Sequence, residues 1–257
     1  MALLLSATAA EACRAMPTGR ADVVRSSVIE RPSGNPNHLT RAWYSGLSDR
    51  YGHGVLGDAL EPTVLHAMSA GTSAQCGLSV EAGAGHVFED TAPRLVDVTG
   101  DGAPEVIAVR SSLERGAQLV VYAPSGDGRS LGPIAATPYI GTRNRWLAPV
   151  GAADLDGDGH VEVAFVDRPH LAKVLRVWRY RDGDFREVAA AEGFTNHRIG
   201  EADIAGGVRD CGQGPEMIVA SADWSRLLAV RYDGAFRVRE IGRDTSRPAF
   251  ASAMECR

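Results

Sequence analysis

Lysine is almost absent from this sequence: Lys173 is the only one among 257 residues, and arginine supplies the remaining positive charge. With a formal net charge of −5 and no basic stretch, the chain lacks the electrostatic footprint of a nucleic-acid-binding protein, so we expect no nucleic-acid partner. No apolar run is long enough for a membrane span. Helical periodicity is scarce after the first dozen residues, which favours a chain made of strands.

Catalytic and zinc-binding motifs are also missing. The sequence has no GxSxG elbow, HExxH helix, Walker loop or dinucleotide glycine fingerprint, so we lean against an enzyme. The cysteines show no CxxC spacing, which argues against a zinc or redox site. In an oxidising compartment they could form two disulfides in three connectivities, and we expect Cys256 near either Cys13 or Cys211. The cysteines are Cys13, Cys76, Cys211 and Cys256.

The most informative feature that is present is an acidic, glycine-containing loop at 154–162. Carboxylates occupy its first, third, fifth and ninth positions, and a backbone carbonyl would serve at the seventh. Such carboxylates repel one another unless a cation lies between them, and this many hard oxygen ligands suit Ca²⁺. The loop is not an EF-hand, because position twelve is Phe165. Asp-Gly pairs alone would only make hairpin turns. The predicted ligands are Asp154, Asp156, Asp158, His160 and Glu162.

Related loops recur in the same chain. The loop at 97–105 has the same layout and also runs into an apolar strand, with Thr99 in place of one carboxylate. A third copy at 203–216 has inserted residues and has lost its central carboxylates, so we expect it to keep the strand without the metal. A fainter echo ends at Glu61. The predicted ligands of the second metal loop are Asp97, Thr99, Asp101, Ala103 and Glu105.

The spacing of these loops predicts an all-β protein built of propeller blades. Units of about fifty residues that are rich in short strands are typical of propellers. Asp182-Gly183 and Asp233-Gly234 each separate two alternating runs, which is a strong hairpin signal. Each unit therefore reads as four antiparallel strands.

The combination of strand, Asp-rich loop and apolar strand resembles the FG-GAP or VCBS-type repeat of the integrin α-subunit propeller and of many exported bacterial proteins. Residues 154–162 match that loop well, with Glu162 where the family has Asp, and residues 97–105 match less well. The resemblance extends over residues 93–242. It implies a β-propeller in which the loop joins the first two strands of a blade and holds Ca²⁺ as a structural ion. It implies no particular activity, because this repeat has many roles.

We expect one propeller domain over residues 13–257 with five blades, and four or six are the alternatives. Propellers commonly close by building one blade from both chain ends, which removes an exposed sheet edge. The expected blades are 51–92, 93–146, 147–199 and 200–242, with a terminal blade from 21–50 plus 243–257.

The first residues predict export. Residues 1–12 are short and apolar and end in small side chains, as in a secretory signal peptide, although a positive first region is missing. An N-terminal helix packed on the domain is the alternative. We therefore expect a periplasmic or secreted protein, a monomer without a membrane span.

Two classes of function stay open. The first is a non-enzymatic binding or interaction module for an unknown protein or carbohydrate, with structural Ca²⁺. A lectin-like propeller, or an enzyme acting on extracellular polysaccharide at the channel mouth, is the alternative. No catalytic residue is predicted. Histidines ahead of inner strands and tryptophans in loops are the candidate ligand-binding residues, although ordinary packing would also explain them: His53, Arg145, Trp146, His197 and Trp224.

Overall fold

A computed structural model describes residues 23–71, 77–126 and 130–257. The predicted signal peptide at 1–12, Cys13 and Cys76 lie outside these residues. The described part contains four antiparallel sheets, one short 3-10 helix η1 (Arg25–Ser27) and one helix α1 (Arg247–Met254). The prediction of an all-β propeller fold is confirmed, with four or five strands in each antiparallel sheet.

Each sheet is formed mainly by strands that are consecutive in the sequence. The first sheet contains β1 (Ile29–Glu30), β2 (Leu39–Ser48), β3 (Glu61–Ser69) and β4 (Leu78–Glu81). The second contains β5 (His86–Phe88), β6 (Arg94–Val96), β7 (Glu105–Ser112), β8 (Gly116–Pro124) and β9 (Leu131–Ala136). The third contains β10 (Leu147–Ala153), β11 (Glu162–Asp167), β12 (Val174–Arg181) and β13 (Asp184–Glu192). The fourth contains β14 (Phe194–Thr195), β15 (Gly207–Asp210), β16 (Pro215–Ser221), β17 (Leu227–Tyr232) and β18 (Phe236–Gly242).

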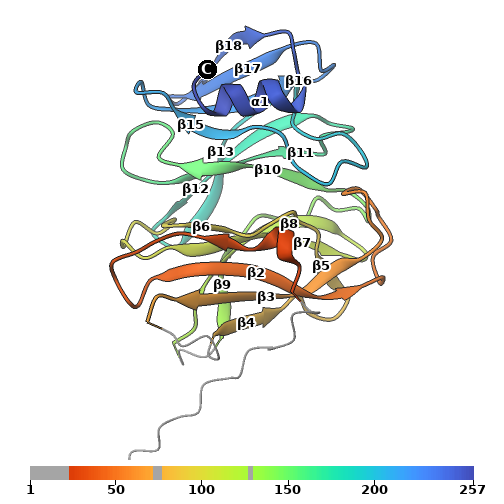
Figure 1. Cartoon of the computed structure of the whole chain (residues 1–257), viewed down its shortest axis with the longest axis vertical. Coiled ribbons are helices and arrows are strands. Elements are labelled where there is room, and N and C mark those ends of the chain that lie inside the picture. The colour runs from red at the N-terminus through yellow and green to blue at the C-terminus, as the bar shows by residue number, and fades with distance from the viewer. Residues whose placement is uncertain (1–22, 72–76, 127–129) are drawn as a thin grey trace, which may run out of the picture.

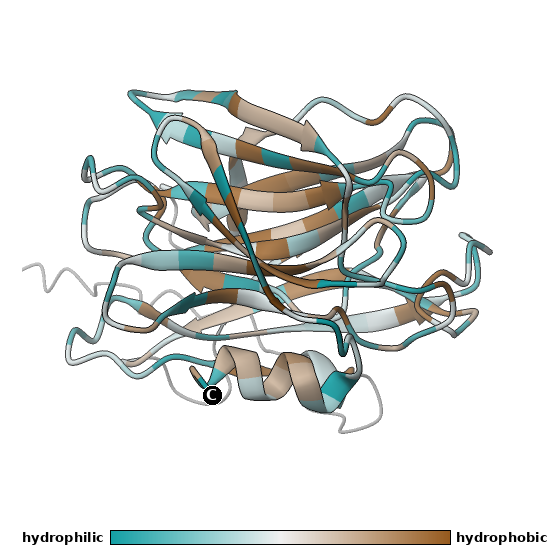
Figure 2. Ribbon diagram, turned by 90° about the horizontal axis from the view of Figure 1, so that it is seen from above, coloured by the Kyte–Doolittle hydropathy of each residue, from teal (hydrophilic) through white to brown (hydrophobic). Residues whose placement is uncertain are grey.

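The sheets lie face to face in sequence order, from the first at the bottom of Figure 1 to the fourth at the top. Alternation along the strands gives each inner sheet two apolar faces. In β16, Met217 and Val219 face the third sheet, whereas Ile218 and Ala220 face the opposite way. Figure 2 shows the resulting distribution, with brown apolar residues along the strands and teal residues at many of the loops.

The predicted hairpins are present. Asp182 and Gly183 have positive φ angles of 53° and 83° and connect β12 to β13. Gly234 has a φ of 88° in the turn between β17 and β18. Aspartate and glycine tolerate this left-handed conformation better than other residues, which is why the local sequence was sufficient to predict both turns.

The predicted terminal blade of 21–50 plus 243–257 is wrong. The strand β2 pairs with β3 inside the first sheet, so this blade starts at Ile29 and the expected boundary at residue 51 falls in its first long loop. The chain end forms helix α1 instead of a strand, with the Ser246 side chain accepting a hydrogen bond from the Ala249 N–H. Four sheets occur in the described ranges, and a count of five blades is not confirmed.

Helix α1 packs on the face of the fourth sheet that points away from the third. Phe250 and Ala253 are buried there against Ile218 and Ala229. The helix therefore covers an apolar sheet face that a neighbouring blade covers elsewhere in the stack.

The loop between β2 and β3 connects the two ends of the stack. In Figure 1 this orange segment rises on the right toward the fourth sheet. The Tyr51 hydroxyl accepts a hydrogen bond from the Asn144 N–H at 3.1 Å, and the Val55 carbonyl accepts one from the Gly200 N–H at 2.9 Å. We call residues 51–60 the connecting loop.

Candidate metal centre

The loop at 154–162 lies between β10 and β11 and is organised around Asp154. Its Oδ1 accepts a hydrogen bond from the Gly157 N–H at 2.8 Å and its Oδ2 accepts one from the Gly159 N–H at 3.0 Å. Both glycines have positive φ angles, 77° and 89°, which L-residues with a side chain rarely adopt. The two turns fold the loop back on itself.

This folding brings carboxylates together. Oxygen atoms of Asp154, Asp156 and Glu162 all lie within 4.8 Å of one another. Glu162 is fully buried, and its Oε2 accepts a hydrogen bond from the Leu155 N–H at 2.8 Å. Burial raises the pKa of Glu162 above its ordinary value, although hydrogen bonds from Arg179 and Leu155 work against this. Three converging carboxylates match the hard oxygen ligands that Ca²⁺ prefers.

Arg179 on β12 also lies in this centre. It pairs with Glu162 across the β11–β12 ladder, and its guanidinium forms ion pairs with Asp156 and Glu162. A third ion pair joins Arg179 Nη1 to Asp158 Oδ2 at 2.9 Å. The donor atoms fit a hard cation in kind, but such an ion would compete with the guanidinium for Asp156 and Glu162, two of the three converging carboxylates.

The loop at 97–105 has the same turn with different partners. Asp97 accepts hydrogen bonds from the N–H groups of Gly100 and Gly102 at 2.8 and 2.9 Å. Glu105 accepts bonds from the Val98 N–H at 2.7 Å and the Thr99 hydroxyl at 3.1 Å. Within the described ranges, three potential ligand atoms meet only in the 154–162 loop. The hydroxyl of Thr99, which was predicted to be a metal ligand, donates its hydrogen bond to Glu105 instead.

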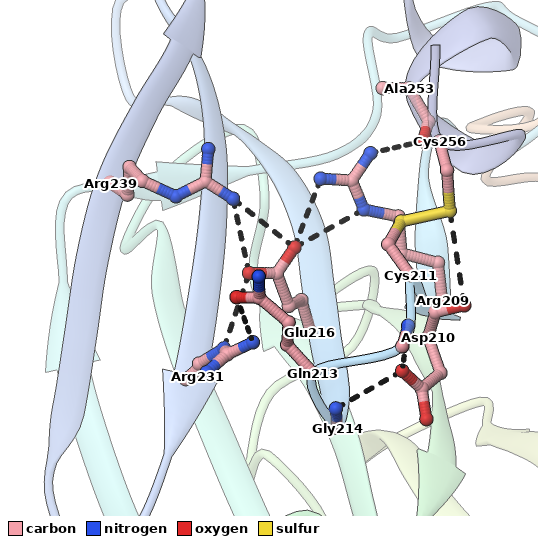
Figure 3. Close-up of a disulfide and its surroundings, with 11 residues drawn as sticks. Arg209, Asp210, Cys211, Gln213, Gly214, Glu216, Arg231, Arg239, Ala253 and Cys256 are labelled. Carbon is pink, nitrogen blue, oxygen red and sulfur yellow. Dashed lines mark hydrogen bonds and ion pairs between the residues drawn. A yellow bond between two sulfur atoms is a disulfide. The ribbon is translucent and has the colours of Figure 1, made fainter.

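In the third copy, arginines surround the surviving glutamate. Figure 3 shows Glu216 of β16 facing three guanidinium groups: Arg209 at 2.9 Å, Arg231 at 3.2 Å and Arg239 at 3.1 Å. The strand after the loop is present as predicted. The sequence-based prediction missed Arg179 and these three arginines. Their positions in strand-like segments close to an acidic loop could have indicated that they pair with its carboxylates.

Glu216 should contribute to stability through these arginines. Burial works to raise its pKa, but hydrogen bonds from Arg209 and Arg239 outweigh burial and hold the pKa below its ordinary value. We expect Glu216→Gln to lower the free energy of unfolding by about 2 kcal/mol at pH 7, because the buried Arg209 guanidinium loses its counter-charge, whereas Arg231 and Arg239 are partly exposed.

Urea unfolding across the acid range tests this expectation. A depressed folded-state pKa supplies stability above the unfolded pKa of about 4.3 that disappears as the pH falls through the folded value, so the difference should shrink in acid. Glu187→Gln is the control, since that glutamate pairs with Arg176 but is 34% exposed. Equal stability of parent and Glu216→Gln at pH 7 would contradict the assignment.

The structure brings three of the five predicted ligand-binding residues together. His53 pairs with Glu89, whose backbone carbonyl accepts a hydrogen bond from Trp146 Nε1 at 2.8 Å. The rings of Trp146 and His197 lie 4.9 Å apart, edge to face. Trp146 is 2% exposed and His197 is fully buried, so in this structure neither offers a face to a ligand.

Three other residues complete the description of this region. His170, which the sequence did not single out, lies 3.0 Å from His197, and burial followed by the His197 charge lowers its pKa to about 4. Arg145 donates a hydrogen bond to the Asn144 carbonyl. Trp224 lies apart from the group, with the Arg198 guanidinium 3.7 Å above its ring. The Trp224 ring also lies against Phe250 of helix α1.

A family comparison identifies the repeat. Residues 97–165 match the model of the FG-GAP-like repeat, a span that contains both intact acidic loops and reaches into β11. No curated protein matches the chain. Among the residues that the structure describes, no helix is long and apolar enough to cross a membrane.

Several solved structures are similar in shape at low identity. Sqt1 of Saccharomyces cerevisiae is 12% identical with a TM-score of 0.43, covering 84% of this chain and 47% of that one. The exotype rhamnogalacturonan lyase YesX is 13% identical with a TM-score of 0.46, covering 82% and 48%. The periplasmic gluconolactonase PpgL of Pseudomonas aeruginosa is 12% identical with a TM-score of 0.36, covering 83% and 73%. The chain spans about half the length of the first two, and none of the three assigns it an activity.

Proposed function

We propose that this chain, which carries FG-GAP-like repeats in a β-propeller fold, is a non-enzymatic binding module that holds Ca²⁺ as a structural ion. The observation that supports the ion is the meeting of Asp154, Asp156 and Glu162 oxygens within 4.8 Å on one tight turn. Mutual repulsion of these carboxylates is relieved by a divalent cation, and oxygen ligands favour Ca²⁺ over softer metals.

The ion would act on stability and not on chemistry. Asp154 belongs to the loop, whereas Glu162 is the first residue of β11, so a shared cation ties the turn to the strand. Ligand binding to the folded state alone stabilises it by about 2.7 kcal/mol when the ligand is a hundredfold above its dissociation constant. The ion would therefore stabilise the third sheet, which lies between the second and the fourth.

Arg179 sets the strength of this binding. Its guanidinium already neutralises part of the loop charge through Asp156, Asp158 and Glu162. In the absence of Ca²⁺ the arginine holds the carboxylates together, and in its presence the two cations compete. Arg179→Gln should therefore be less stable than the parent in EGTA and gain more from Ca²⁺.

Thermal unfolding in EGTA and in millimolar Ca²⁺ tests the proposal. We expect Ca²⁺ to raise the Tm of the parent, to raise that of Arg179→Gln by more, and to leave Asp154→Ala unchanged. Asp184→Ala is the matched control, because this aspartate is 66% exposed at the start of β13. No shift in the parent, or an undiminished shift in Asp154→Ala, would rule out the ion at this loop.

We propose that the protein functions outside the cytoplasm. The Cys211–Cys256 disulfide fits an oxidising compartment, where such bonds persist. The apolar start of the sequence supports export, and its cleavage can be tested by N-terminal sequencing of the protein recovered from the medium or periplasm.

A further inference from the structure

A pocket lies where the connecting loop meets the fourth sheet. Its volume is about 330 Å³, and it is bordered by the end of the connecting loop, the segment after β5 and the segment that precedes β15. The backbone bond between Val55 and Gly200 holds two of these segments together. The residues of interest on its wall are Leu47, Asp58, Leu60, Glu61, Asp90 and Asp203.

Glu61 has no hydrogen-bond partner at its buried Oε1, although it is only 2% exposed. It is the first residue of its strand β3, as Glu105 is of β7 and Glu162 is of β11. Those two glutamates accept backbone N–H bonds, and Glu216, the second residue of β16, is surrounded by arginines. In the first sheet Glu61 has neither kind of partner at Oε1, and an unpartnered buried polar atom costs stability unless a ligand supplies the missing bond.

Asp90 also lines this pocket and has an oxygen without a hydrogen-bond partner. Its Oδ2 accepts bonds from the Arg94 guanidinium at 2.7 Å, the Tyr44 hydroxyl at 3.1 Å and the Val109 N–H at 3.0 Å. Its Oδ1 is buried and without a partner. Asp90 as a whole is only 5% exposed.

The spacing of these carboxylates fits an organic cation better than a metal ion. In the described part of the chain, three ligand atoms come within 4.8 Å of one another only in the 154–162 loop, so the pocket carboxylates do not converge on a point. The pocket also has an apolar side. Leu47 and Leu60 are 52% and 45% exposed, and they border it together with Leu56.

We propose that this pocket binds an alkylammonium group, with the charged nitrogen at Glu61 and Asp90 and the methylene chain along Leu47 and Leu60. The same chemistry is offered by a free aliphatic diamine and by a lysine side chain of another protein. The inference rests on the proposed binding role and names its ligand class, but it does not depend on Ca²⁺ at the 154–162 loop.

The ionisation of Glu61 supports this reading. Burial raises its pKa to about 9, and the charges of Glu89, Asp58 and Asp90 act in the same direction. The carboxyl therefore keeps a proton at neutral pH in the free protein. An entering ammonium group supplies the opposite charge, so binding should release that proton and strengthen as the pH rises from 7 toward 9.

Titration calorimetry at pH 8 with two probes tests the proposal. Cadaverine represents a free diamine, Nα-acetyl-lysine methylamide represents a protein side chain, and pentanol is the uncharged control. We expect the parent to bind at least one amine and not pentanol. Glu61→Gln should bind that amine at least about tenfold more weakly, since a lost charge-assisted bond of about 1.5 kcal/mol corresponds to that factor. Glu187→Gln, which changes a carboxylate on the outer strand β13, should bind like the parent.

A stability measurement separates lost binding from lost folding. A raised folded-state pKa contributes stability that is complete below the unfolded pKa and disappears as the pH rises through the folded value, so the parent should lose Tm between about pH 5 and 9. Glu61→Gln removes this loss and should melt higher than the parent at pH 8.

Three results would overturn the proposal: no amine bound by the parent, unchanged amine binding by Glu61→Gln, or a Ca²⁺ shift in Tm lost in Glu61→Gln but kept in Asp154→Ala. The last result would assign a metal to the pocket. Failure of the Ca²⁺ prediction at Asp154 alone leaves the amine titration unaffected, so the two proposals fail separately. Tighter binding of cadaverine identifies a free diamine as the source, and tighter binding of the lysine derivative identifies a protein.

Discussion

Gly206→Ala is expected to lower the free energy of unfolding by about 4 kcal/mol or more, a size reached only by exceptional substitutions. Gly206 has a φ of +79°, and a Cβ added there would lie 1.9 Å from the backbone oxygen of Ile218. Because that oxygen belongs to the buried central strand β16, it cannot rotate away as a side chain would. The clash must move the strand, and with it the two cores that meet on its faces.

Urea unfolding of this variant should be compared with Gly234→Ala. Gly234 has a similar φ of +88°, but nothing lies within 4 Å of its added Cβ. The control therefore carries only the conformational cost of a left-handed alanine, about 1–2 kcal/mol. Equal losses in the two variants would show that the close approach at Gly206 is relieved by a small shift.

Removing the Cys211–Cys256 disulfide should have the second-largest effect. The bond joins residues 45 apart in sequence and fixes the chain end to the loop between β15 and β16. The chain-entropy account gives about 4 kcal/mol for a closed loop of this length. Figure 3 shows the bond beside Arg209, whose guanidinium donates to the Ala253 carbonyl. Without the disulfide, helix α1 is held by this contact, by its apolar packing and by the bonds of Arg247 to Glu201 and Asp203.

The double variant Cys211→Ser/Cys256→Ser is the appropriate test, because it removes this bond alone. We expect lower stability in urea and faster amide hydrogen exchange in β16 and β17, whose outer faces α1 covers. Phe250→Ala keeps the disulfide and removes the largest apolar side chain of the helix, so it should speed exchange in the same strands. Unchanged exchange in both variants would mean that α1 does not protect this sheet.

The sequence predicted what local chemistry decides. The Asp154 loop and the Asp182-Gly183 turn depend on residues that are neighbours in the chain, so their patterns were sufficient. The disulfide was among the pairings left open. Arg179 was missed because its role depends on the register between β11 and β12, which places it opposite Glu162.

The chain ends were harder to predict because tertiary packing decides them. Helix α1 has only eight residues, too few for a stable helix in isolation, and it forms against the exposed face of the fourth sheet. The blade boundary at residue 51 failed because β2 pairs with β3 rather than with the chain end. The missing partner of Glu61 cannot be seen in a sequence at all, since the absence of a contact is a property of the folded chain.

The connecting loop has a consequence for synthesis on the ribosome. Val55 belongs to the first part of the chain to emerge, whereas its partner Gly200 emerges after the first three sheets have been made. Sequential folding can complete those sheets early, but the connecting loop must wait for the fourth, and long-range closures of this kind are slow. A nascent chain stalled before residue 200 would therefore carry most of the blades while Asp58 and Glu61 still faced open water. The proposed amine-binding pocket would therefore form last, only after the connecting loop has made its contact with the fourth sheet.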